Sequence, residues 1–411
     1  MHMTKNLNQT HRSILVIIII MLAAFSRLGY NLVLETGDHN VLYGDEHNYN
    51  DIAWNLVSGR GYSMDGVTPT AYRPPTVPMI IAGIYTLVGS RLYLAVRILF
   101  SIIDVLTVIL SFFLCRDLFG WRAAILTGFA MALHPYLIMS TSKLLTETTL
   151  AFLLVLTAYC IHRLPNGRFV IWGTLAGVSL GLAILARSET IILLGFVVLY
   201  LFHRFYRGRG DLLKSITAIT LGMLFVLLPW AYRNMAVFGE FIPLSTSGGL
   251  AFYGAHNMQE LLSDPGNWNY FPPSKGEIDG LSEVSTDKKL YLLGISSLFD
   301  YLRPRPWRLI RLEIMKLYFM FIGYGDWRSL VSVPLVFFAF LGLTWSISQR
   351  KIDVCFPFVA TILTVTIIFY GSIRFRLPYD PFFVILASNG AINYFLVLRR
   401  NWQKSGIRST V

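Results

Sequence analysis

Long apolar runs constrain the fold of this chain more than any other feature. Several are about 18 to 22 residues long, and a helix of roughly 20 apolar residues crosses the hydrocarbon core of a bilayer. Hydrophobic residues make up 55% of the 411 residues and charged residues only 14%, whereas about 25% is usual in soluble domains. So few charges cannot cover a soluble globule. We therefore predict an all-α polytopic membrane protein, in which the net charge of +12 is no sign of nucleic-acid binding.

We predict ten spans, leave their number open by one or two, and treat residues 1–411 as a single integral membrane domain. The predicted spans are Ser13–Ser26, Leu94–Cys115, Ala123–His134, Leu145–His162, Phe169–Ala186, Thr190–His203, Leu212–Trp230, Leu330–Ser348, Val354–Tyr370 and Tyr379–Leu398.

The distribution of charge predicts the orientation. If the N-terminus lies inside, the inner segments hold sixteen basic and three acidic residues, and the rest of the chain has a net charge of −1. Such an excess on one side is typical of cytoplasmic loops. We expect a protein of the cell membrane with both termini cytoplasmic and its long loops outside. The three cysteines, Cys115, Cys160 and Cys355, then lie near inner ends of spans, so we expect no external disulfide.

Two external segments, residues 27–93 and 231–328, are much longer than a connection requires. In the first, Asn48–Val57 has apolar residues at helical spacing and Pro75–Val88 is apolar but short, so we predict two helices lying on the membrane surface. The second contains the basic amphipathic stretch Lys288–Lys316. We expect its arginines to contact lipid phosphates.

Asp45 and Glu46 follow Gly44 in the first external segment. Adjacent carboxylates point in different directions, so one can face a reacting centre, but from the pair alone a solvated turn with helix-capping acids is the simpler explanation. His39 and His47 lie nearby at a spacing that matches no zinc motif. A divalent cation held by one of these acids and a substrate phosphate stays open.

Arg73 lies in Tyr72-Arg73-Pro74-Pro75, where the prolines predict a rigid, extended backbone. Its forked guanidinium suits a lipid phosphate, although an arginine that reaches the headgroups without a specific role fits too.

Glu147 lies at the outer end of a predicted span, where an unpaired carboxylate is costly. A salt bridge to Lys143, four residues earlier, is its plain explanation. Arg97 and Asp104 lie seven residues apart on one helix face and are expected to pair.

Arg374 and Arg376 occupy a short outer turn at the same membrane level as Asp45, Arg73 and Glu147. Two or three carboxylates and several arginines at one interface predict a pocket for an anionic, membrane-borne substrate, with an acid left to accept a proton.

The order of these features resembles the GT-C superfamily of polyprenyl-phosphate-sugar glycosyltransferases, in particular the branch with protein O-mannosyltransferases and the lipid A aminoarabinose transferase. The resemblance runs from about Ser13 to Leu398 and implies a GT-C-like bundle of about 10 to 12 helices. The matching residues are Asp45-Glu46 with Tyr49, Arg73-Pro74-Pro75, His134-Pro135 to Thr146-Glu147, Pro229-Trp230 with Arg233-Asn234, and Arg374-Phe375 with Pro378 and Pro381.

The resemblance implies that a sugar moves from a polyprenyl-phosphate donor to an acceptor hydroxyl on the outer face, with inversion. It assigns the base to Asp45, a second acidic role to Glu147, and phosphate binding to Arg73, which replaces a lysine of the aminoarabinose transferase. The candidate substrate-binding residues are Glu46, Tyr49, Tyr72, Arg73, Arg97, Arg233, Arg374 and Arg376.

The acceptor, whether lipid, glycan or protein, is not implied, because the chain ends soon after its last span and no soluble C-terminal domain is expected. Two alternatives stay open. One is a transporter or flippase of a lipid-linked sugar that uses the same arginines only for binding. The other is a membrane acyltransferase built around His134.

Overall fold

The computed structural model describes residues 9–35, 42–206, 208–269, 271–274, 276–323, 327–349 and 352–408. Over these residues the chain is almost entirely helical, and its only strand-like feature is an isolated bridge between Ser63 and Pro69. The predicted all-α membrane fold class is therefore confirmed. His39, for which a metal role was considered, lies outside the described residues.

Every predicted span corresponds to a helix. These helices are α1 (Gln9–Glu35), α4 (Tyr93–Phe119), α5 (Trp121–Ala132), α7 (Glu147–Arg163), α8 (Phe169–Ile184), α9 (Ile192–Arg204), α10 (Arg209–Phe238), α15 (Trp327–Ser348), α16 (Cys355–Ile368) and α18 (Asp380–Arg408).

Six candidate spans among the described residues are long and apolar enough to cross a membrane, and they correspond to α1, α4, α7, α10, α15 and α18. The other four helices are shorter, and that they also cross the membrane stays a prediction.

The external segments form the remaining helices. The first contains α2 (Asp45–Val57) and α3 (Thr76–Val88), and the second contains α11 (Gly248–His256), α12 (Met258–Ser263), α13 (Glu283–Leu302) and α14 (Arg308–Phe321). Short connecting helices are α6 (Pro135–Ser140), η1 (Leu164–Asn166), η2 (Ser188–Ile191), α17 (Ile373–Arg376) and η3 (Leu377–Tyr379).

Both helices predicted in the first segment are present, and their position on the membrane surface stays a prediction. The stretch Lys288–Lys316 is interrupted between α13 and α14, where Pro304 and Pro306 supply no backbone donor. Arg303 and Arg305 are exposed in this break. Their contact with lipid phosphates stays a prediction.

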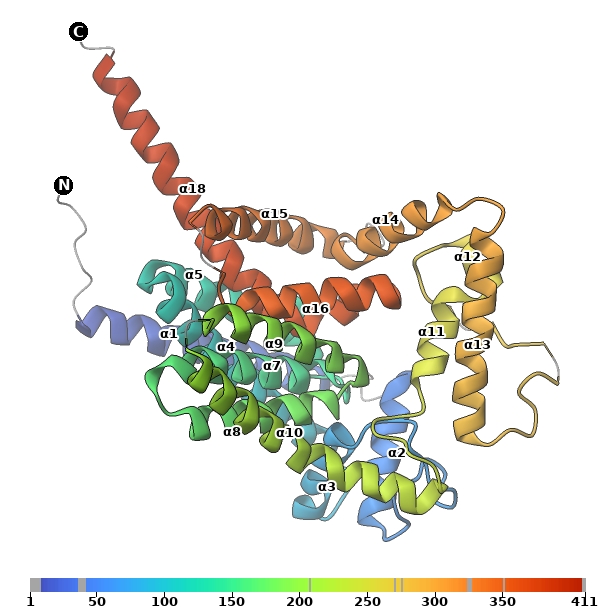
Figure 1. Ribbon diagram of the computed structural model, residues 1–411. Helices are drawn as coiled ribbons and strands as arrows, with labels where there is room; N and C mark the ends of the chain where they lie inside the picture. Colours follow the sequence, from blue (N-terminus) through green and yellow to red (C-terminus); the bar gives the residue numbers. More distant parts are fainter. Residues whose placement is uncertain are drawn as a thin grey trace.

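Figure 1 shows how the helices are arranged. The start of α1 and the end of α18 lie on the left of the view, and α2 and α11 to α13 lie on the right. The helices of the external segments are thus gathered at the end of the molecule opposite these two helix ends. Which side of a membrane each end faces stays a prediction.

The α8–α10 contact depends on glycines. Gly173, Gly177 and Gly181 are spaced four residues apart on α8, and a Cβ on Gly173 would lie 2.6 Å from the Ala218 Cβ of α10. A Cβ on Gly177 would lie 2.1 Å from the Ile219 carbonyl oxygen. Small residues at this spacing let two helix backbones approach closely, which is a common way to pack spans.

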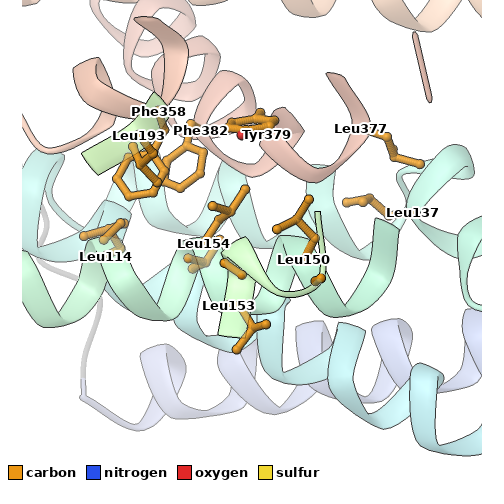
Figure 2. Close-up of a cluster of buried hydrophobic side chains, with 14 of the residues drawn as sticks. Leu114, Leu137, Leu150, Leu153, Leu154, Leu193, Phe358, Leu377, Tyr379 and Phe382 are labelled. Carbon is orange, nitrogen blue, oxygen red and sulfur yellow. The ribbon is translucent and has the colours of Figure 1, made fainter. Parts of the chain in front are cut away.

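The centre of the bundle is packed by large apolar side chains (Figure 2). Leu150 and Leu154 of α7 lie near Leu193 of α9 and near Phe358 and Phe382 of α16 and α18, and all five are fully buried. The two phenylalanine rings stack with their centroids 4.1 Å apart. This packing fixes α7, which begins at Glu147, and α18, which follows the turn that carries Arg374.

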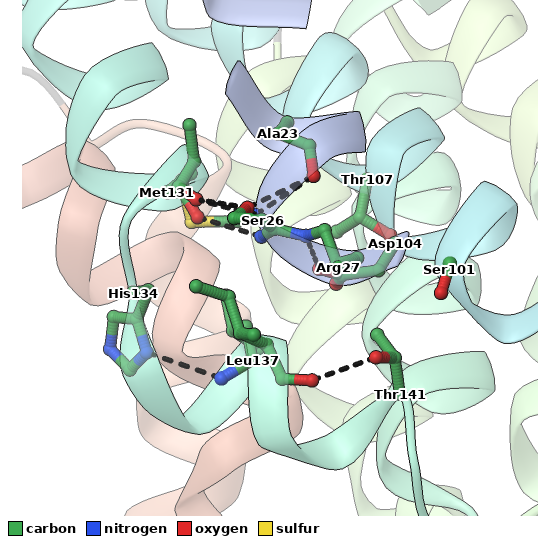
Figure 3. Close-up of polar contacts among 12 residues, drawn as sticks. Ala23, Ser26, Arg27, Ser101, Asp104, Thr107, Met131, His134, Leu137 and Thr141 are labelled. Atoms are coloured by element: carbon green, nitrogen blue, oxygen red, sulfur yellow. Dashed lines mark hydrogen bonds and ion pairs between the residues drawn. The ribbon is translucent and has the colours of Figure 1, made fainter. Parts of the chain in front are cut away.

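One predicted ion pair is wrong. Asp104 does not pair with Arg97 but with Arg27 of α1, whose Nε lies 2.7 Å from Asp104 Oδ2 (Figure 3). Arg27 was expected to begin the external segment 27–93, but α1 continues to Glu35 and places this arginine inside the helix. Both partners are fully buried, which a charge between spans tolerates only when it is paired.

Arg97 instead helps to hold the segment between α6 and α7. Its Nε donates to the Ser142 carbonyl oxygen at 3.0 Å. Asn31 of α1 donates to the Ser101 hydroxyl at 2.9 Å and to the Thr141 hydroxyl at 3.0 Å. The first and fourth helices therefore fix the segment that leads directly into α7.

The predicted orientation can be tested by labelling of single cysteines. Thr68 in the first external segment and Asn166 between α7 and α8 are both exposed, and the three native cysteines are buried. In intact cells an impermeant thiol reagent should label Thr68→Cys and not Asn166→Cys. Permeabilised cells, in which both should react, are the control. Labelling of Asn166→Cys alone in intact cells would reverse the orientation.

Candidate active site

Four charged residues from distant parts of the chain meet at one point. Arg374 binds two carboxylates, because its Nε lies 2.5 Å from Glu147 Oε1 and its Nη1 lies 3.0 Å from Asp45 Oδ2. Arg73 Nη2 lies 2.5 Å from the other oxygen of Asp45. The structure thus brings together Asp45, Arg73, Glu147 and Arg374, which we call the ion-pair cluster.

Both carboxylates of the cluster begin helices. Asp45 is the first residue of α2 and Glu147 is the first residue of α7. An acidic side chain is favourable there because the first backbone N–H groups of a helix are unpaired. Gly44 precedes Asp45 with φ 55°, a left-handed value that favours glycine. The local sequence therefore favours a helix start at both acidic residues.

Aromatic rings surround Arg73. Its Cζ lies 5.3 Å from the ring centroid of Tyr49 and 4.8 Å from that of Tyr72, which are cation–π distances. The Tyr62 hydroxyl donates to the Arg73 carbonyl oxygen at 2.7 Å. The arginine is therefore held on both sides, and its Nε has no hydrogen-bond partner among the described residues.

The electrostatic state of Asp45 follows from these contacts. Burial alone would raise the pKa of Asp45, because an ionised carboxylate loses water. Arg73 and Arg374 outweigh this effect and hold its pKa below the ordinary value. Asp45 is therefore ionised at neutral pH, and it is a weak proton acceptor as long as both arginines bind it.

Glu46, predicted to bind substrate, is bound by backbone. Its Oε1 accepts a hydrogen bond from the N–H of Leu144 at 2.9 Å, and its Oε2 accepts one from the N–H of Tyr43 at 3.1 Å. The predicted Lys143–Glu147 pair is wrong, since Lys143 Nζ lies 3.6 Å from Glu46 Oε2 and Glu147 binds Arg374. Glu46 thus connects α2 to the segment before α7.

No group of three or more His, Cys, Asp or Glu side chains is arranged to hold a metal ion within the described ranges. His47 is exposed at the surface of α2. A divalent cation bound jointly with a substrate phosphate stays a hypothesis.

Two further predicted binding residues are occupied by the protein itself. Arg233 donates to the carbonyl oxygens of Thr70 and Tyr62 at 2.8 and 3.3 Å, which holds the loop before Arg73. Arg376 is fully buried and its Nε binds Asp380 at 2.8 Å. Its Nη1 and Nη2 also donate, to the Met320 carbonyl and the Ser332 hydroxyl. Together with Arg97, these arginines hold the frame around the cluster and are not part of it.

Sequence reasoning missed Arg187. It directly precedes η2, whose first residue is Ser188. Its Cζ lies 3.9 Å from the ring centroid of Phe375, the neighbour of Arg374, and its Nε lies 2.9 Å from Glu189 Oε1. The position of Arg187 at the outer end of α8, level with Glu147, was the available signal.

Two cavities lie beside the cluster, and their linings share no residue. The larger, of about 680 Å³, has mostly apolar walls and includes Pro75, two residues after Arg73, and Tyr62, whose hydroxyl donates to the Arg73 carbonyl oxygen. The smaller, of about 330 Å³, includes Glu147, Arg374 and Lys143. We call them the apolar cavity and the cationic pocket.

Comparison with known proteins identifies the fold. A family model described as dolichyl-phosphate-mannose-protein mannosyltransferase matches residues 72–232, less than half of the chain. The oligosaccharyltransferase AglB from Archaeoglobus fulgidus, solved with an inhibitory peptide and a dolichol-phosphate, superposes with a TM-score of 0.57 and 15% identity. The match covers 96% of this chain and 52% of AglB. This chain has the same fold as the part of AglB that it matches.

The GT-C resemblance predicted from the sequence is thus confirmed, and the chain spans about half the length of AglB. ArnT from Cupriavidus metallidurans, bound to undecaprenyl phosphate, matches with a TM-score of 0.46 and 18% identity over 94% of this chain and 78% of ArnT. The Pmt1-Pmt2 O-mannosyltransferase complex of S. cerevisiae, bound to the sugar donor, matches with a TM-score of 0.40 and 17% identity. This match covers 65% of this chain and 38% of the yeast chain. None of the curated proteins matches the chain.

The role of Arg187 can be tested through stability. Arg187→Met leaves the partly buried Glu189 carboxylate without its cation and should cost roughly 1 to 3 kcal/mol, between the small value of an exposed ion pair and the larger cost of breaking a buried one. The apparent melting temperature in detergent should fall, and the double variant Arg187→Met, Glu189→Met should regain part of the loss. If Glu189→Met has the same effect with and without Arg187, the two side chains do not interact.

Proposed function

We propose that the protein is a membrane glycosyltransferase that moves a sugar from a polyprenyl-phosphate donor to an acceptor hydroxyl on the external face. One observation carries the proposal: Asp45 is bound by two guanidinium groups beside a large apolar cavity. The dolichol-phosphate bound to AglB and the donor named in the matching family description support the class of donor.

The apolar cavity suits the isoprenoid chain of such a donor. About 680 Å³ is within the usual size range of small-molecule pockets. Leu153, Leu182 and Trp230 contribute to its walls, and Pro75 and Thr76 place it next to Arg73. A lipid chain lying there carries its phosphate toward the cluster.

The two arginines then stabilise the leaving group. When the bond between the anomeric carbon and the phosphate oxygen breaks, negative charge increases on the phosphate. Arg73 and Arg374 can bind that charge through charge-assisted hydrogen bonds, which are shorter and stronger than neutral ones. In the free protein both bind Asp45, so the phosphate and Asp45 compete for the same guanidinium groups.

This competition gives Asp45 its role as base. As the arginines turn to the phosphate, the pKa of Asp45 rises from its lowered value, and the carboxylate becomes a better proton acceptor. Asp45 takes the proton of the acceptor hydroxyl, whose oxygen bonds to the anomeric carbon on the face opposite the departing polyprenyl phosphate. The configuration at the anomeric carbon is thereby inverted. Glu147 stays on Arg374 Nε and keeps that side chain in place.

The alternatives are less well supported. A transporter needs polar groups along the spans, but the buried Arg27 and Asp104 of α1 and α4 bind each other, and Asp45 and Arg374 of the cluster lie between the predicted spans. An acyltransferase would need a reactive His134. Its Nδ1 accepts a hydrogen bond from the N–H of Leu137 at 3.4 Å, so the ring caps the start of α6.

Substitution of Asp45 tests the proposed function. Asp45→Asn keeps the size of the side chain but cannot accept the proton, so turnover should fall by roughly 10² to 10⁴-fold. Binding of donor should persist. Asp51→Asn is the matched control, because Asp51 lies on the same helix in an exposed ion pair with Arg91 and should keep full activity. Purified protein is supplied with labelled polyprenyl-phosphate sugars, and release of polyprenyl phosphate and transfer of label are measured.

Three outcomes would contradict the proposal. No transfer by the wild type across the donor panel, together with movement of the lipid, would indicate a transporter. A full rate in Asp45→Asn with loss in Glu147→Gln would move the base to Glu147. Equal losses in the Asp45 and Asp51 variants would show that α2 is merely destabilised.

A further inference from the structure

The cationic pocket lies on the other side of Arg374 from the residues that line the apolar cavity, and the proposed function gives it no ligand of its own. It is lined by the segment between α6 and α7, by α14 and by the turn that carries Arg374, and none of its residues lines the apolar cavity. We propose that this pocket binds the acceptor, and that the acceptor is an amphiphile with a phosphate group close to its reacting hydroxyl. This inference rests on the proposed function.

Lys143 is the first reason. Its side chain is 44% exposed and lines the pocket. Its Nζ lies 3.6 Å from Glu46 Oε2, which is too long for a hydrogen bond, and both oxygens of Glu46 already accept backbone N–H groups. None of the described residues accepts a hydrogen bond from this ammonium. Its Nζ lies 5.2 Å from the ring centroid of Tyr43, which also lines the pocket, so this ammonium can donate hydrogen bonds to a ligand there.

Arg374 is the second reason. Its Nε and Nη1 bind Glu147 and Asp45, and no described residue accepts a hydrogen bond from its Nη2. The side chain is 45% exposed and lines the same pocket as Lys143. One lysine and one arginine with unused donors suit a phosphate, which both residues bind through charge-assisted hydrogen bonds.

The walls of the pocket indicate that this phosphate belongs to an amphiphile. Leu145, Phe319, Ile373 and Leu377 lie on the lining, so a ligand that fills the pocket buries apolar surface as well as its anionic group. A free phosphate would leave these walls uncovered. The phosphate is therefore expected to be carried on a lipid-like molecule.

The position of the pocket matches the direction of attack. Inversion requires the acceptor oxygen and the leaving phosphate to lie on opposite faces of the sugar. Glu147 at the start of α7 lines the cationic pocket, and Thr149 of the same helix lines the apolar cavity. A hydroxyl entering from the pocket meets Arg374 and, through it, Asp45, whose carboxylate is to take its proton.

Equilibrium binding to the purified full-length protein tests the proposal without any donor. The probe is decyl glucoside 6-phosphate, with decyl glucoside as the neutral match and glucose 6-phosphate as the match without a chain. The phosphorylated glucoside should bind at least about tenfold more tightly than either match, as expected for a charge-assisted hydrogen bond. Lys143→Gln should remove most of this difference, and Lys143→Arg should keep part of it.

Two control variants locate the site. Lys288→Gln removes an exposed lysine of α13 that pairs with Glu240, and it should leave binding unchanged. Arg73→Ala removes a donor-side arginine and should keep the preference for the phosphorylated probe. Because Lys143 is half-exposed, the melting temperature of Lys143→Gln should equal that of the wild type.

Three results would overturn the inference. The first is equal binding of the phosphorylated and neutral glucosides. The second is a preference for the phosphorylated glucoside that survives in Lys143→Gln but is lost in Arg73→Ala. The third is binding of glucose 6-phosphate as tight as that of its decyl derivative. The second result would place the probe in the donor site. Because this experiment measures no sugar transfer, none of the three results would contradict the proposed transferase activity.

Discussion

The double ion pair of Arg374 with Glu147 and Asp45 is the interaction on which the candidate site depends. Glu147 is only 4% exposed and lies 227 positions before Arg374 in the chain. A buried carboxylate requires a partner, so the turn between α16 and α18 must come to the start of α7. The same guanidinium then holds Asp45 on α2, and three distant segments meet at one cation. The two arginines outweigh the effect of burial, hold the pKa of Asp45 below its ordinary value and so keep that acid ionised at neutral pH.

The second external segment also stabilises the position of Arg374. Lys316 of α14 is buried, and its Nζ donates to the Ile367 carbonyl oxygen at 2.6 Å, to Glu313 Oε1 at 3.1 Å and to His256 Nε2 at 3.3 Å. Burial is the main reason that the pKa of His256 is lowered to about 3, and a neutral ring can accept this hydrogen bond. The end of α16, just before the turn with Arg374, is therefore fixed by α11 and α14. On the other side, Arg233 fixes the loop before Arg73.

The sequence predicted features that depend on composition and spacing, and it failed for partners brought together by the fold. The length of the apolar runs predicted helices α1 and α4. The common depth of the charged residues at the predicted outer face predicted that Asp45, Arg73, Glu147 and Arg374 share one site. The pairs expected within one helix, such as Arg97 with Asp104, were wrong because Arg27 reaches Asp104 from another helix. Arg374 and Arg376 could not both face the site, since residues two apart on a helix point in different directions. That argument predicts that only one of the two arginines faces the site. It does not predict which one, because the burial of Arg376 depends on its contacts with Asp380 and Ser332.

The central claim is that polyprenyl phosphate takes Arg73 and Arg374 from Asp45 and so turns a weak base into an effective one. The most direct measurement is the pKa of the Asp45 carboxyl, followed by isotope-edited infrared spectroscopy of labelled aspartate, with Asp45→Asn used to assign the band. In the free protein the pKa should lie below the ordinary value of 3.8, because the two arginines outweigh burial. It should rise when undecaprenyl phosphate binds. A pKa that stays low or falls further on binding would contradict the exchange of arginines and the assignment of Asp45 as the base.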